Sequence, residues 1–138
     1  MKLTKQKATV LGKACFKKYK KQFCLDTWII TTKYKRTKHK KDGTKAQVDD
    51  CLPEYEIAKI TIFYNNAESI ADLEATIRHE LIHILLSPFT YYDCYMHEAL
   101  CDNKEAFILY GELFKVANEG TVRNIEKMLD RIPNKSRS

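Results

Sequence analysis

Two histidines, four residues apart, lie inside the most aliphatic run of the chain. The run is IRHELIHILL, residues 77–86, and it contains His79, Glu80 and His83. Aliphatic runs normally exclude ionisable side chains, because burying such groups without a partner costs free energy. On a helix, positions i and i+4 lie one turn apart on the same face, so both imidazoles would point to one place. The run therefore predicts a helix with aliphatic packing on one side and a histidine pair on the other.

The sequence also marks the ends of this helix. Ser69, followed three residues later by Asp72, is the pattern of an N-cap with an acidic partner in the first turn. Pro88 stops the helix after about Leu86. The two histidines project within roughly 40° of each other, on the side opposite the apolar residues. Those apolar residues recur at helical spacing: Ile70, Leu73, Ile77, Leu81, Ile84 and Leu85.

The pattern H-E-x-x-H on a helix is typical of a zinc site. Two histidines at this spacing can hold one Zn²⁺, and the glutamate between them can act as a general base. His79 and His83 are therefore predicted as metal ligands. Glu80 is predicted to activate a zinc-bound water and to pass its proton to the leaving group. The alternative is a pair of ordinary surface histidines, but the capped helix and its aliphatic surroundings favour one bound zinc and a peptide or protein substrate.

A catalytic zinc site needs a third protein ligand from outside this helix, because it has three protein ligands and one open position. A second long helix is predicted over about residues 97–117, after a short loop that would fold it back against the first. Glu105 is the preferred ligand, and Glu98 and His97 stay open as alternatives. The acidic and histidine residues on or beside this helix are His97, Glu98, Asp102, Glu105 and Glu112.

Glu105 is preferred because of its helical neighbours. Cys101, Ile108 and Leu109 surround it on the helix surface. A carboxylate that enters an apolar interior needs a partner such as a metal ion. Glu98, Glu105 and Glu112 are seven apart and share a face, and Glu112 is expected to be solvated.

The front half of the chain favours strands. Residues 26–34, 45–52 and 56–64 are β-branched, aromatic or alternating, and Pro53 ends the second of these segments. A short basic helix is predicted over residues 6–22. Together with the later helices these segments predict an α+β fold with a small, mainly antiparallel sheet. The strand over 56–64 would align an extended peptide if it lay at a sheet edge, and would be an ordinary buried strand otherwise.

The end of the chain predicts a further break and a further helix. Gly120 is expected to end the second long helix, and Thr121 to cap a short terminal helix before Pro133. The tail, residues 133–138, is expected to be frayed.

Length and charge limit the possible classes of protein. A chain of 138 residues accommodates one domain, predicted over 1–138 with a basic N-terminal segment, 1–25. Residues 1–50 hold 15 lysines and arginines against 4 acidic residues, so the net charge of +6 divides into +11 there and −5 in the rest. The lysine-rich segment 33–45 could bind nucleic acid or another polyanion, although such loops are more often simply solvated.

The sequence has no features of an exported or membrane protein. No apolar stretch is long enough to span a bilayer, and lysines interrupt the N-terminus where a secretory signal would be apolar. A soluble, cytoplasmic protein with no membrane partner is therefore expected. The cysteines are odd in number and scattered without CxxC spacing, which predicts free thiols. They are Cys15, Cys24, Cys51, Cys94 and Cys101.

The string EATIRHELIHILLSPFT, residues 74–90, resembles small zinc metallopeptidases of phages and prophages, relatives of SprT-like proteins and other minimal zincins. In that family a strand like AKITIFY precedes the H-E-x-x-H helix, and a helix like NKEAFILYGEL follows it. The resemblance spans roughly residues 26–117. It implies a minimal zincin-like fold and a cytoplasmic location in a bacterial host.

The resemblance also implies roles for individual residues. His79 and His83 would bind one Zn²⁺, Glu80 would be the general base, and Glu105 would be the acidic ligand from the next helix. SprT-like proteins supply a third histidine instead, and His97 is the only one downstream. The implied activity is zinc-dependent hydrolysis of peptide bonds. Two alternatives remain, a protease acting on DNA-associated proteins and a non-catalytic binding or regulatory protein stabilised by zinc.

Overall fold

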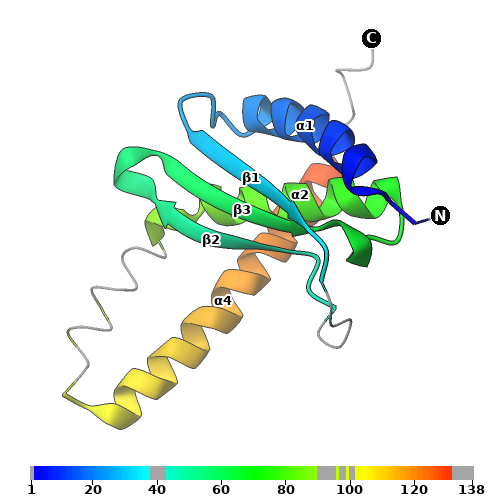
Figure 1. Ribbon diagram of the computed structural model, residues 1–138. Coiled ribbons are helices and arrows are strands. Elements are labelled where there is room, and N and C mark those ends of the chain that lie inside the picture. Colours follow the sequence, from blue (N-terminus) through cyan, green and yellow to red (C-terminus); the bar gives the residue numbers. More distant parts are fainter. Residues whose placement is uncertain (1, 38–42, 90–95, 97–98, 100–101, 132–138) are drawn as a thin grey trace. The chain divides into compact units, whose positions relative to one another are not determined.

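The computed structural model describes residues 2–37, 43–89, 96, 99 and 102–131, which form an α+β structure (Figure 1). The chain divides into two compact units, residues 1–88 and residues 89–138. The second unit contains helix α4 (Lys104–Arg131). The first unit contains helix α1 (Lys5–Gln22), strands β1 (Ile29–Lys35), β2 (Ala46–Leu52) and β3 (Ile57–Phe63), and helix α2 (Ile70–Leu85). All five elements of the first unit were predicted near these positions.

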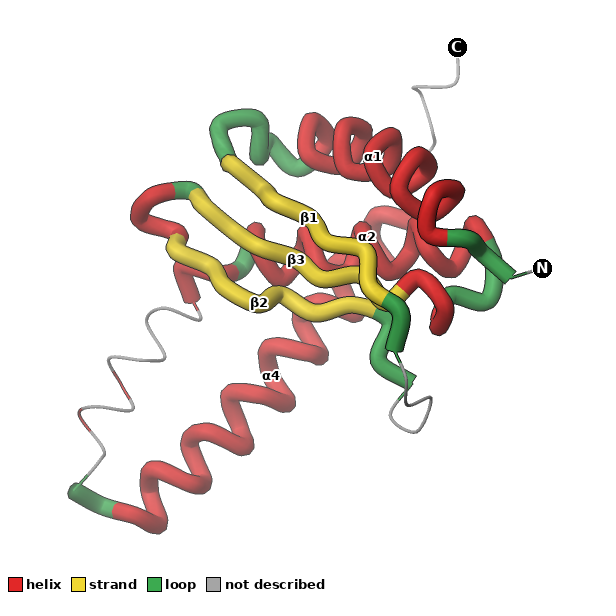
Figure 2. The backbone as a smooth tube through the Cα atoms, in the orientation of Figure 1, coloured by secondary structure: helices red, strands yellow, loops and turns green. Residues whose placement is uncertain are grey.

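The sheet is mixed, whereas the sequence predicted a mainly antiparallel one. Its strand order is β1-β3-β2, with β3 parallel to β1 and antiparallel to β2 (Figure 2). The consecutive strands β1 and β2 therefore do not pair with each other, because β3 lies between them. Strand order of this kind depends on contacts between distant segments, and no local turn signal encodes it.

Strand β3 is the centre of the sheet, so of the two alternatives the buried strand is confirmed and the peptide-aligning edge strand is excluded. Both of its edges are already paired with other strands. For example, Ile57 pairs with Ile29 of β1 on one side and with Leu52 of β2 on the other. Its side chains agree with this central place. Ile60 and Ile62 are almost completely buried, and Thr61, on the opposite face, is only 3% exposed.

Helices α1 and α2 pack against each other, and they contact β1 and β2 respectively. The side chains of α1 that are buried include Phe16 and Tyr19. Gly12, near the middle of α1, lies against the phenol of Tyr34 in β1, where even a Cβ atom would overlap the hydroxyl oxygen of Tyr34. The helix can therefore approach the strand closely only because residue 12 has no side chain.

A partly buried hydrogen bond also joins α1 and α2. The Tyr19 hydroxyl donates to Glu74 Oε1 over 2.6 Å, and Lys18 Nζ lies 3.2 Å from the same oxygen. The hydrogen bond from Tyr19 is the main cause that lowers the pKa of Glu74, burial opposes it, and Lys18 adds to the lowering. In turn, burial and Glu74 raise the pKa of Tyr19 to about 12.

Glu74→Gln is expected to lower the free energy of unfolding by about 1 kcal/mol at neutral pH, the usual contribution of one such hydrogen bond. A carboxyl whose pKa is lowered by folding stabilises the protein above its unfolded pKa, and this contribution is lost as pH falls through the folded pKa. The difference between Glu74→Gln and wild type should therefore shrink as pH falls below about 4.3, the ordinary glutamate pKa, and vanish below the lowered folded pKa. Urea unfolding at neutral pH and at an acid pH in that range measures it, with the exposed Glu54→Gln as a matched control. Equal differences at both pH values would contradict this role.

In the second unit, α4 is one continuous helix of 28 residues, so the predicted break at Gly120 is wrong. A glycine inside a helix costs only about 1 kcal/mol, which packing on either side can offset, and Val122 nearby is fully buried. Thr121 does not cap a new helix, because its hydroxyl donates to the carbonyl of Ala117 over 2.8 Å. The helix begins at Lys104, and the side-chain oxygen of Asn103, the residue before it, accepts from the amide of Ala106.

The predictions about the cysteines and about membrane-spanning segments can be compared with the described residues. Cys15, Cys24 and Cys51 are free thiols, as predicted, whereas Cys94 and Cys101 lie outside the described residues. Within the described part of the chain, no helix combines the length and the apolar character needed to cross a membrane.

Candidate metal centre

Hydrogen bonds fix the start of α2, the helix that carries the histidines. The Ser69 hydroxyl accepts from the Asp72 amide over 3.1 Å, and the Asp72 carboxylate accepts from the Glu68 amide over 2.9 Å. These bonds satisfy amides that the first turn leaves unpaired. Burial would raise the pKa of Asp72, but hydrogen bonds from Lys45, at 2.8 Å, and from the Glu68 amide hold it below its usual value. The predicted N-cap is thus confirmed.

The two histidines of α2 face each other. His79 Nε2 and His83 Nε2 are 3.1 Å apart, and the ring centroids are 4.8 Å apart with the planes at 69°. Two imidazole nitrogens bound to one tetrahedral Zn²⁺ at about 2.0–2.1 Å lie roughly 3.3 Å apart. The pair is therefore spaced almost as a shared zinc ion requires. Both side chains are half-buried, so neither is an ordinary solvated histidine.

Glu80 lies beside this pair and is buried. The residue is only 8% exposed, and the buried polar residues among those described are Thr61, Glu80 and Ser87. On the helix wheel Glu80 is about 60° from His83, between the histidines and the aliphatic face. A carboxylate in that position is largely shielded from bulk water.

Aliphatic side chains surround the histidines along α2. Leu81, Ile82 and Ile84 are completely buried, as expected for residues that exclude water from a site. The predicted apolar face is confirmed at its centre by Leu73 and Ile77, which are also buried. Its two ends, Ile70 and Leu85, are 41% and 38% exposed, because they lie at the two ends of the helix.

A carboxylate of α4 is a candidate third ligand. His79, His83 and Glu119 are side chains that could together hold one metal ion. Glu119 is half-buried, as are the two histidines. Two imidazoles and one carboxylate are a donor set used by catalytic zinc sites, which keep a fourth position open.

The residues predicted as the third ligand were Glu105, with Glu98 and His97 as alternatives. His97 and Glu98 are outside the described residues. Glu105 is in the first turn of α4 and exposed, and its neighbours Ile108 and Leu109 are 49% and 58% exposed, so the expected apolar surroundings are absent there. Glu105 as a metal ligand stays a prediction.

The sequence contains a signal that points to Glu119. The seven-residue spacing that relates Glu98, Glu105 and Glu112 reaches Glu119 at its next step. Positions seven apart share a helix face. Because Gly120 was expected to end the helix, the seven-residue spacing was not extended to Glu119.

Comparison of the chain with protein-family models, with curated proteins and with solved structures gave no match. The candidate metal centre therefore rests on its own side-chain chemistry.

Proposed function

We propose that this protein is a zinc-dependent peptidase. The observation that carries the proposal is the 3.1 Å separation of the His79 and His83 Nε2 atoms on a helix with the order H-E-x-x-H. In this pattern the histidines bind zinc and the glutamate between them serves as general base. The resemblance of residues 74–90 to small phage-type metallopeptidases supports the same reaction class.

His79, His83 and Glu119 would hold the metal, and this assignment is supported by their donor chemistry. A zinc ion bound by such a set supplies Lewis acidity, which lowers the pKa of water and polarises a carbonyl oxygen. The imidazoles must be neutral to act as ligands, so protons compete with the metal and its binding weakens as pH falls.

Glu80 would carry the proton. Its carboxylate accepts a proton from the attacking water and then donates it to the amine that leaves when the peptide bond breaks. The position of Glu80 beside the histidines and its burial support this role, because a carboxylate in an apolar setting interacts strongly with a nearby reacting group. The aliphatic residues Leu81, Ile82 and Ile84 limit the access of other water molecules.

The activity test uses a denatured, fluorescently labelled protein as substrate, because unfolded chains offer many peptide bonds in extended form. The full-length wild-type protein should cleave it, a chelator should stop cleavage, and added Zn²⁺ should restore it. A preparation that contains zinc but never cleaves the substrate would favour the alternative of a non-catalytic protein stabilised by zinc. Cleavage that persists in chelator after the zinc is removed would overturn the proposal.

A further inference from the structure

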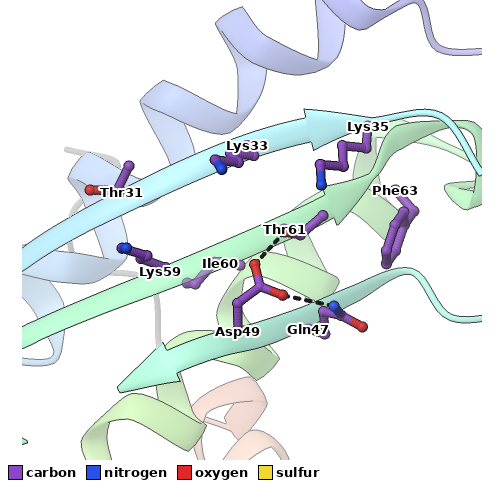
Figure 3. Close-up of a pocket in the computed structure, with 9 residues that line it drawn as sticks. All are labelled: Thr31, Lys33, Lys35, Gln47, Asp49, Lys59, Ile60, Thr61 and Phe63. Carbon is purple, nitrogen blue, oxygen red and sulfur yellow. Dashed lines mark hydrogen bonds between the residues drawn. The ribbon is translucent and has the colours of Figure 1, made fainter. Parts of the chain in front are cut away.

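The sheet has a hollow on the face that α1 and α2 do not cover (Figure 3). Its volume is about 450 Å³, within the usual range of ligand sites. Lys33 and Lys35 reach it from β1, Lys59 and Phe63 from β3, and Asp49 from β2. The hollow is independent of the histidine pair, which lies on α2.

Positive charge dominates this hollow. Three lysines face a single carboxylate, that of Asp49. That carboxylate is already engaged, because Thr61 donates to one oxygen and Gln47 Nε2 donates to the other over 2.7 Å. These two hydrogen bonds, and then Lys35 and Lys33, lower the pKa of Asp49, so it stays ionised. Among the described residues, Lys33, Lys35 and Lys59 make no ion pair within 4.0 Å.

The lysines are arranged in a row. Lys33 and Lys35 are alternate residues of β1, so they point to the same face about 7 Å apart. Lys59, on the neighbouring strand β3, pairs in register with Thr31, so it extends the row by one step, displaced sideways by one strand. A row of cations with little internal neutralisation favours an extended anion over a single small one.

A second basic hollow lies just beyond the end of β1, beside the start of α1. Arg36, the residue after Lys35, lines a hollow of about 330 Å³ together with Lys2 and Lys5. Tyr64, which follows Phe63, also lines it. This second hollow adjoins α1, which packs on the face of β1 opposite the lysine row, so it is a separate basic site.

We propose that this face of the sheet binds single-stranded nucleic acid. Phosphates would lie along Lys33, Lys35 and Lys59, and a base would stack on Phe63, which is only half-buried and pairs in register with Lys35. Stacking on an aromatic ring together with lysine contacts to phosphates is the usual way that proteins bind single strands without sequence preference. A duplex fits less well, because its base faces are already stacked. An acidic peptide fits less well too, because it has no base to stack on the Phe63 ring.

The test measures fluorescence anisotropy of a labelled oligothymidylate of about 20 nucleotides with the full-length protein at several salt concentrations. One variant combines Lys33→Gln, Lys35→Gln and Lys59→Gln. Its matched control removes the same charge from exposed positions of α1 with Lys13→Gln, Lys17→Gln and Lys21→Gln. Melting temperature and zinc content check that each variant is folded.

The sheet variant should weaken binding at least about tenfold, and its salt dependence should be shallower by about 2 in log–log slope. The α1 control should bind nearly as wild type does. Phe63→Leu should weaken binding about fivefold or more, because stacking of one base is lost. The proposal is overturned by absent binding to wild type, by equal loss in both lysine variants, by an unchanged Phe63→Leu, or by polyglutamate competing as well as the oligonucleotide.

Discussion

Glu80→Gln should keep its zinc and lose peptide hydrolysis by a factor of about 10²–10⁴, the usual contribution of a general base. Glutamine has nearly the same shape as glutamate but cannot accept the proton of the attacking water. Because Glu80 is buried beside the histidines and is not in the proposed ligand set, the metal should stay bound. Cleavage of the denatured substrate and zinc content, measured on the same preparation, test both halves of this prediction.

Glu74→Gln is the matched control for this variant, since it changes the same residue type on the same helix. It should lower stability slightly and leave cleavage unchanged, because Glu74 contacts Tyr19 and Lys18 of α1 instead of the histidines. Full activity in Glu80→Gln would contradict the proposed mechanism. Loss of zinc from Glu80→Gln would show that this glutamate supports the metal and would remove its role as a proton carrier.

Glu119→Gln should lower the affinity for zinc about 100-fold or more. Even residues that only orient a ligand change metal affinity by about 10–100-fold, so the loss of a ligand should cost at least that much. The same substitution at Glu112 and at Glu105, one and two steps of seven residues earlier on α4, should have little effect. Competition with a fluorescent zinc chelator gives the three dissociation constants.

These three variants also distinguish between Glu105 and Glu119 as the third ligand. If Glu105→Gln weakens zinc binding and Glu119→Gln does not, the ligand predicted from the sequence is the correct one. If neither variant differs from wild type, the third ligand is another residue, and His97 and Glu98 become the next positions to replace.

Local features of the sequence predicted the site helix well. The N-cap at Ser69, the buried residues Leu73 and Ile77, and the facing of His79 and His83 all follow from helical spacing and from interactions within one or two turns. Such features depend on residues close in sequence, so they can be inferred without the rest of the fold.

Features that depend on distant segments were predicted less well. The insertion of β3 between β1 and β2 changed the sheet from antiparallel to mixed, and no turn residue signals it. Gly120 is a strong helix-ending residue in isolation, but α4 continues through it. The predicted helix ended near residue 117, so its seven-residue spacing of glutamates stopped at Glu112 and did not extend to Glu119.

The most direct test of the metal centre is the zinc content of the purified protein by elemental analysis, with no metal added during purification. Wild type should contain about one zinc per chain. The double variant His79→Ala and His83→Ala should contain almost none, while its unfolding transition remains cooperative. Absence of zinc from wild type, or equal zinc in both proteins, would contradict the assignment of this histidine pair as a metal site.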